Sequence, residues 1–182
     1  MDLRIVKTRK NIREAFLELR AKNALEKIKV NRLCELALIN KTTFYKHYRD
    51  VYELSEEIEN ESIKSIMDSF EHMNFLFINS DEFIKGLYEA FKSHKDEVMT
   101  LFSGRMNVLI DKVEKQLITH YPTLSRDPEK EIMTAFLLKG ASHVLMESKY
   151  EETVMLDALI KVARQIIAFI NDEKNLRDGG YQ

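Results

Sequence analysis

Chain breakers are scarce in this sequence, and their scarcity constrains its fold more than any other feature. Two prolines and five glycines interrupt 182 residues, and two of those glycines, Gly179 and Gly180, lie in the last four positions. Because proline and glycine mark turns and hairpins, so few of them favour long helices. The hydrophobic content of 45% is sufficient for a buried core. The sequence therefore predicts an all-α protein of about nine helices.

The first fifty residues show helical periodicity broken by two short turns. A first helix is expected from Leu3 or Thr8 to Ala21, because residues 12, 16 and 19 form one apolar stripe. Asn31 is a favourable N-cap for a second helix, from Arg32 to about Leu38. Asn40 tolerates the unusual backbone angles of a tight turn. A third helix is then expected from Lys41 or Thr42 to Tyr48.

The third of these helices has two chemically different sides. Phe44 and Tyr48 are four positions apart, so both can pack against neighbouring helices. The other side offers hydroxyl, ammonium and imidazole groups: Lys41, Thr42, Thr43, Tyr45, Lys46 and His47. Such groups reach DNA phosphates, and threonine methyls can touch thymine methyls. The pattern indicates a helix-turn-helix whose second helix enters the major groove. The alternative is a solvated polar face on a helical hairpin.

Charge is distributed unevenly along the chain. Residues 1–50 carry a net charge of +7, and the remaining residues carry −9. A basic segment of an acidic protein predicts that double-stranded DNA contacts this segment alone, although a chance cluster of solvated charges is the alternative. We therefore expect a DNA-binding domain over residues 1–50, with its motif at about 29–48. Residues 51–182 are expected to form a helical regulatory and dimerisation domain.

A long helix is expected to connect these two domains. Asp50, followed by Glu53, has the spacing of a capping box, and the apolar pattern continues to Met73 or beyond. Further helices are expected over residues 80–91, 95–102 and 106–120, with breaks at Gly104 and near Pro122.

The last two expected helices suggest a homodimer. One starts at Asp127 and Pro128 and reaches Lys149, and the other covers about Thr153 to Lys174. Because both are apolar on most sides, we expect a four-helix bundle between two copies of the chain, with a buried hairpin in a monomer as the alternative. The candidate interface residues are Phe136, Val144, Leu159, Ala163, Ile166 and Ile170.

The sequence contains none of the motifs of the common catalytic and metal sites. The five histidines are never closer than 22 positions, and CxxC, phosphate-loop and nucleophile-elbow patterns are missing. Cys34 is interpreted as a small buried hydrophobe. We expect no enzyme activity, no cofactor and no metal.

The longest apolar run has five residues, Ile166–Ile170, against roughly 20 for a membrane span. With no visible signal peptide and one cysteine, a cytoplasmic location is expected.

The residues from Thr8 to about Leu54 resemble the TetR/AcrR family of transcriptional regulators. Thr43–Tyr48 is similar to the family pattern T-[LF]-Y-x-H-[FY], Ile28–Val30 resembles its connector, and Ala37–Lys41 resembles its turn. The resemblance implies an all-helical homodimer whose two recognition helices enter successive major grooves of a palindromic operator. It also implies a repressor that a small ligand releases.

The resemblance assigns DNA contacts by position. Lys41, Thr42 and Thr43 open the recognition helix as base or phosphate contacts, Tyr45 and His47 contact phosphates, and Lys29 approaches a phosphate. Asn40 and Lys46 complete the expected set. Two departures affect it: Leu38 stands where the family usually has Gly, and Val51 stands where it often has Lys.

The resemblance leaves the regulatory signal open. Candidate residues for a small apolar ligand are Phe83, Leu87, Phe91, Phe102, Met106, Leu109 and His143, with ordinary core packing as the alternative for each. The other possibility is a DNA-bound co-regulator controlled by a protein partner, which the acidic C-terminal region and the apolar segment 75–78 favour.

Overall fold

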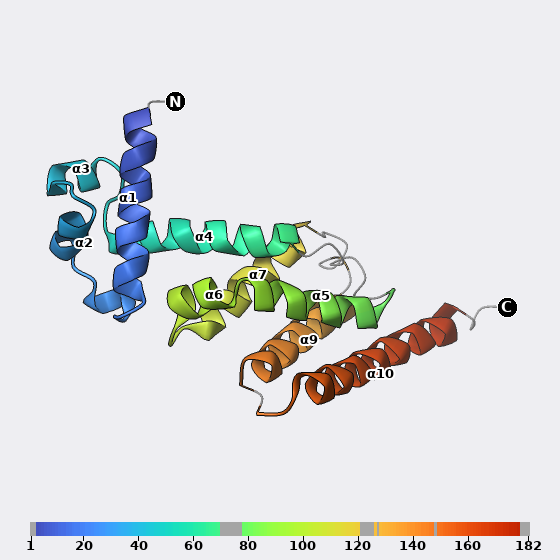
Figure 1. The fold of residues 1–182 in the computed structure, drawn as a ribbon. Helices are drawn as coiled ribbons and strands as arrows, with labels where there is room; N and C mark the ends of the chain where they lie inside the picture. Colours follow the sequence, from blue (N-terminus) through green and yellow to red (C-terminus); the bar gives the residue numbers. More distant parts are fainter. Residues whose placement is uncertain (1–2, 70–77, 121–125, 127, 148, 179–182) are drawn as a thin grey trace. The chain divides into compact units, whose positions relative to one another are not determined.

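The structure, a computed structural model, describes residues 3–69, 78–120, 126, 128–147 and 149–178. Within those ranges it contains nine α-helices, one short 3-10 helix and no strand (Figure 1), which confirms the all-α prediction. The helices are α1 (Leu3–Arg20), η1 (Leu25–Lys27), α2 (Val30–Leu36), α3 (Lys41–Tyr45), α4 (Val51–Ser69), α5 (Ser80–Ser93), α6 (Lys95–Phe102), α7 (Met106–His120), α9 (Pro128–Glu147) and α10 (Glu152–Asp178). None of the described helices is long and apolar enough to cross a bilayer.

The chain divides into two compact units. The first unit contains residues 1–65 and 94–109, and the second contains residues 66–93 and 110–182. The first unit thus adds most of α4 and the whole of α6 to the expected DNA-binding segment. The expected boundary after residue 50 separates a DNA-binding from a regulatory domain by function, not by contacts, and it stays a prediction.

The first unit is built around the apolar stripe of α1. Ile12 and Phe16 are fully buried, together with Leu33 of α2, Phe44 of α3 and Leu54 of α4. Helix α1 packs against α2 and α6, and α2 packs against α3. The predicted first helix is therefore confirmed, and its apolar stripe forms the centre of this unit.

The second unit has its own core. Phe83 and Ile84 of α5 lie in one cluster with Leu137 of α9 and with Ile160 and Ala163 of α10. Helix α10 packs along α5 and against α9. Two ion pairs join α10 to α5: Arg164 Nε donates to Asp81 Oδ1 at 2.7 Å, and Lys92 Nζ lies 3.4 Å from Glu152 Oε1.

Most helix boundaries follow the sequence signals. Helices α6 and α7 have the expected bounds, because Gly104 adopts a φ of +72° between them. Asp50 Oδ1 accepts a hydrogen bond from Glu53 N–H at 2.8 Å at the start of α4. Residue Met73, where α4 was expected to reach, lies outside the described residues, as does Asp127 before α9.

Two predictions about the second and third helices are wrong. Asn31 is not the N-cap of α2: the Leu33 N–H bonds to the Lys29 carbonyl at 3.1 Å, so the helix already begins at Val30 and Lys29 is its cap residue. The third helix was expected to reach Tyr48, but α3 ends at Tyr45. Tyr48 still contacts Phe44, with ring centroids 5.8 Å apart, so the expected aromatic side is confirmed.

Candidate nucleic-acid interface

The turn between α2 and α3 has the hydrogen bonds of a Schellman motif. The Leu38 N–H bonds to the Glu35 carbonyl at 3.3 Å, and the Ile39 N–H bonds to the Cys34 carbonyl at 3.0 Å. This motif needs a left-handed residue, and Leu38 provides it with a φ of +55°. Asn40, which was expected to take the unusual angles, is instead extended. The position where the resembling family has glycine is thus the one that requires positive φ.

Asn40 caps α3. Its side-chain Oδ1 accepts hydrogen bonds from the Thr43 N–H at 2.7 Å and from the Thr43 hydroxyl at 2.9 Å. A cap of this kind satisfies backbone donors of the first turn that otherwise lack a partner. Because α3 has only five residues, this cap and its buried aromatic side hold it in place.

The buried side of α3 is fixed by a polar contact as well as by packing. Phe44 is fully buried and Tyr48 nearly so. The Tyr48 hydroxyl donates to Glu57 Oε1 of α4 at 2.8 Å, and Arg9 Nη2 of α1 donates to Glu57 Oε2 at 2.5 Å. Burial and the carboxylate of Glu57 raise the pKa of Tyr48 to about 12. Burial opposes ionisation of Glu57, but the hydrogen bonds from Arg9 and Tyr48 outweigh it and lower the pKa of that carboxyl.

The opposite side of α3 is open to solvent. Tyr45 is 56% exposed, and the other predicted DNA contacts are exposed or half-buried. The exposed ones are Lys29, Asn40, Lys41, Thr42, Tyr45 and Lys46, and the half-buried ones are Thr43 and His47. Seven of these eight residues lie on α3 or within two residues of its ends, whereas Lys29 is the cap residue of α2. Val51, at the other departure from the family pattern, is 5% exposed and packs inward.

No local sequence pattern indicates the ion pairs that join α1 to α4 and α6, or α4 to Arg105. Arg13 of α1 pairs with Glu61 of α4 and, at 3.0 Å, with Glu97 of α6. Glu59 of α4 is 2% exposed and pairs with Arg105 Nη1 at 3.0 Å. These partners lie 46 to 84 positions apart in sequence, where local periodicity carries no information.

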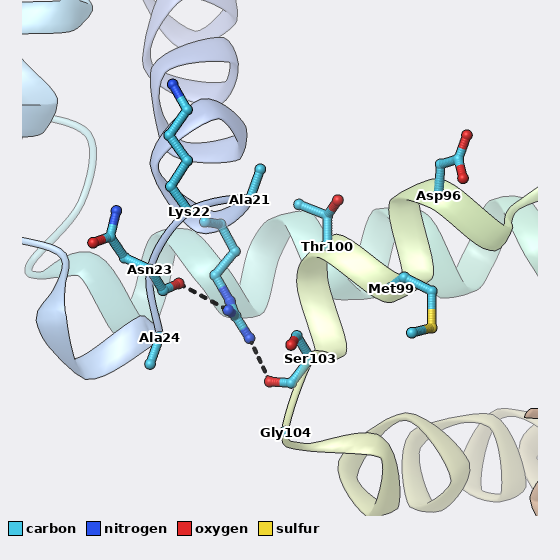
Figure 2. A pocket seen from close by; sticks show the side chains of 10 residues that line it. Ala21, Lys22, Asn23, Ala24, Asp96, Met99, Thr100, Ser103 and Gly104 are labelled. Atoms are coloured by element: carbon cyan, nitrogen blue, oxygen red, sulfur yellow. Dashed lines mark hydrogen bonds between the residues drawn. The ribbon is translucent and has the colours of Figure 1, made fainter. Parts of the chain in front are cut away.

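Arg20, at the end of α1, makes the most buried of these contacts. Its guanidinium donates to the Leu101 carbonyl at 3.1 Å and the Ser103 carbonyl at 2.9 Å, at the end of α6, and to the Asn23 carbonyl at 3.0 Å. Figure 2 shows the bonds to Asn23 and Ser103 as dashed lines. Burial, together with nearby Arg105, lowers the pKa of Arg20. Helix C-terminal carbonyls attract a cation, so Arg20 joins α1 to the end of α6.

An open groove of about 700 Å³ lies between the end of α1 and α6 in the first unit. Figure 2 shows side chains of mixed polarity along it, including Lys22, Asp96, Met99 and Thr100. None of the predicted ligand-pocket residues lines it.

The predicted ligand-pocket residues divide between the two units. Phe102, Met106 and Leu109 belong to the first unit, and Phe83, Leu87, Phe91 and His143 belong to the second. Phe83 and Leu87 pack in the core of the second unit. His143 is on the outside of α9, with its side chain 70% exposed and Nδ1 3.9 Å from Glu147. The placement of these residues favours core packing for Phe83, while the ligand assignment itself stays a prediction.

The predicted dimer residues also differ in their surroundings. Phe136 is 64% exposed on α9, whereas Ala163 is fully buried inside its own unit. Val144 and Leu159 line an open, almost wholly apolar groove of about 310 Å³ with Tyr150, Val154, Met155, Ala158 and Val162. Ile166 is half-buried against the core, and the side chain of Ile170 lies outside the described residues.

Comparison with known proteins gives a match among solved structures. No family model and no curated protein matches this chain. Among solved structures, the chain is similar to a crystal structure of a transcriptional regulator (TerR/AcrR family) from Aquifex aeolicus VF5, with 21% sequence identity and a TM-score of 0.56. The match covers 87% of this chain and 99% of that one. The two proteins therefore share an all-helical fold.

Proposed function

We propose that this protein is a sequence-specific DNA-binding transcriptional regulator. One observation carries the proposal: a capped helix packs its aromatic side into the first unit and presents threonine, tyrosine and lysine side chains to solvent. These groups hydrogen-bond phosphates and base edges, and the major groove of DNA is wide enough to admit an α-helix. The basic charge of residues 1–50 supports a polyanionic partner.

We propose that the regulator binds DNA as a homodimer, with α9 and α10 at the interface between the two copies. Large apolar side chains remain exposed on these helices: Ile132, Phe136, Val154 and Val162 are each at least half exposed. Exposed apolar surface of this extent is characteristic of an interface, and a second copy offers the same surface in return. A dimer would place two recognition helices on successive major grooves, which are roughly 34–36 Å apart, and so read a palindromic operator.

The finer proposal is a repressor that a small apolar ligand releases from this operator. A ligand that favours a different spacing of the two recognition helices by a few kcal/mol would weaken operator binding severely. The proposal rests on the family resemblance and on the apolar residues of α5 and α6.

The alternative is a DNA-bound co-regulator controlled by a protein partner. Ile78, at the end of the apolar segment 75–78, is 79% exposed and favours this alternative. The other residues of that segment lie outside the described residues. Copurification of a stoichiometric partner that changes operator binding, with no response to apolar small molecules, would favour the co-regulator.

DNA binding is tested with the full-length protein and duplex DNA from upstream of its own gene. Fluorescence anisotropy at 50 to 200 mM salt should give salt-dependent binding that prefers this duplex over a scrambled one. Tyr45→Ala and Lys46→Ala should weaken binding, and Lys46→Ala should reduce the salt slope by about one. Lys161→Ala, the same change at an exposed site on α10, is the matched control and should bind as the wild type does. If the wild-type dimer shows no preference between the duplexes, the proposed function is wrong.

A further inference from the structure

Helix α1 extends well beyond the core of the first unit. Its first buried side chain is Ile12, so residues 3–10 form about two helical turns with no buried side chain. Three large aliphatic residues are exposed there: Leu3 is 83% exposed, Ile5 is 44% and Val6 is 43%. We call residues 3–10 the α1 tip. The core packing of α1 begins at Ile12, so the tip adds no buried side chain to the core of this unit.

The α1 tip is strongly basic. It contains no acidic residue and four cations: Arg4, Lys7, Arg9 and Lys10. Arg9 pairs with Glu57, and Lys10 lies 3.8 Å from Glu14. Arg4 and Lys7 lie nearest the start of the helix, and both side chains are exposed to solvent. Cations at a helix N-terminus oppose the macrodipole, and like charges three positions apart repel each other. An external anion would reverse both effects.

The geometry of the first unit relates the tip to the candidate DNA-binding surface. Asn11 Nδ2 donates to the carbonyl of Ala37, just before the α2–α3 turn, at 3.4 Å. Arg4 precedes Asn11 by seven residues, or two turns, so it lies on the same face of α1, about 10 Å further along the axis. The other end of α1 is held to α6 by Arg20. The tip therefore points away from α6 and continues past α3, as Figure 1 shows.

We propose that the α1 tip is a second DNA-contacting element, which binds the sugar-phosphate backbone beside the groove that α3 enters. Arg4 and Lys7 contact phosphates, and the aliphatic groups of Leu3 and Val6 pack on deoxyribose. This inference rests on the proposed function, since it assigns more contact surface to the same duplex. It adds affinity without sequence preference, because phosphates are identical along the backbone.

The test compares two double variants of the full-length protein on the same upstream duplex. Arg4→Ala with Lys7→Ala removes two cations from the tip, and Lys22→Ala with Lys27→Ala removes two exposed cations near the other end of α1. Loss of two phosphate contacts should reduce the slope of log Kobs against log salt by about 1.8. The fall in affinity between 50 and 200 mM salt should then be about twelvefold smaller than for the wild type. The Lys22/Lys27 variant should keep the wild-type slope.

Two further measurements separate the possible outcomes. The ratio of specific to scrambled binding should be unchanged in the tip variant, and Arg4→Lys with Lys7→Arg should restore the slope. A wild-type slope in the Arg4/Lys7 variant overturns the inference and leaves the proposed function intact, whereas failure of the wild type to bind either duplex overturns both. Binding of the wild type to phosphatidylglycerol vesicles that is lost in the tip variant, with an unchanged DNA slope, would assign the tip to a membrane surface instead.

Discussion

The two compact units differ in which apolar and charged side chains they bury and which they expose. The first unit buries its large apolar groups, apart from the α1 tip, Leu38, Met99 and two surface tyrosines, and it also buries charged residues such as Arg20 and Glu59. The second unit leaves Ile132, Phe136, Val154 and Val162 exposed on α9 and α10. Its ion pairs at Lys92 and Lys139 are on the surface. The first unit is thus closed by polar contacts within one chain, while the second has apolar surface available for another chain.

The comparison is tested most severely on the exposed apolar face of the second unit. Phe136→Asp places a carboxylate at a site that is 64% exposed in one chain, so it should leave the fold of that chain unchanged. If α9 and α10 form the dimer, the charge is buried in the interface and the protein becomes monomeric. Operator affinity should then fall by about 10²–10⁴-fold, because the second recognition helix no longer binds from a tethered position.

Light scattering measures the oligomeric state of the Phe136→Asp variant, and fluorescence anisotropy measures its affinity for the operator. Lys115→Asp introduces the same group at an exposed site on α7 and serves as the control. This exposed site is a better choice than Ile166, which packs partly against the core, so that a substitution there would also destabilise the second unit. A dimeric Phe136→Asp variant with normal operator binding would place the interface elsewhere.

The buried polar contacts of the first unit are expected to have the next largest effect. Glu59→Ala removes the partner of Arg105 and the acceptor for the Ser55 hydroxyl. We expect a loss of about 2–3 kcal/mol in the free energy of unfolding. This is less than the usual 3–5 kcal/mol for a broken buried pair, because the Arg105 side chain is 32% exposed. Urea denaturation measures it.

A matched variant of the second unit makes this a comparison between units. Glu152→Ala breaks a pair whose two side chains are about half exposed, and surface pairs contribute little. Its urea midpoint should differ from the wild type by much less than that of Glu59→Ala. Equal losses in the two variants would show that the units do not differ in their dependence on ion pairs.

Tyr48 tests the polar anchor of the recognition helix and gives it a pH signature. Tyr48→Phe removes the hydrogen bond to Glu57 and should cost about 1–2 kcal/mol at neutral pH. The pKa of Tyr48 is raised from 10 to about 12 in the folded protein, which therefore holds the phenol proton more tightly than the unfolded chain. The difference between wild type and variant should be complete below pH 10 and disappear as the pH rises towards 12.

Denaturation curves between pH 7 and 12 measure this difference. Tyr45→Phe, at an exposed tyrosine on the other side of α3, is the control and should leave the stability at neutral pH close to that of the wild type. The same hydrogen bond, with that of Arg9, lowers the pKa of Glu57, so its stabilising contribution should be lost as the pH falls below the ordinary carboxyl range. A difference between wild type and Tyr48→Phe that persists at pH 12 would contradict the proposed anchor.

These examples show which features were predictable from sequence. The buried side of α3 was predictable because Phe44 and Tyr48 are aromatic and four positions apart, and α6 and α7 were predictable because Gly104 separates them. The Glu59–Arg105 pair and the Arg20 contacts were not, because they join residues 46 and 81 positions apart. The start of α2 was missed because its cap residue, Lys29, makes no side-chain cap bond that a composition rule would detect.

Leu38, one of the exposed apolar residues of the first unit, provides the smallest and most local test. It is 88% exposed and holds a left-handed conformation that costs a residue with a Cβ atom roughly 1–2 kcal/mol. Leu38→Gly removes that strain and loses almost no buried surface, but it increases the entropy of the unfolded chain. We expect a net stabilisation of up to about 1 kcal/mol in urea denaturation. Ala37→Gly, one residue earlier in a right-handed and buried position, should instead destabilise the protein. If both changes destabilise it, the left-handed turn is not strained by leucine, and the Leu38 side chain contributes to stability despite its exposure.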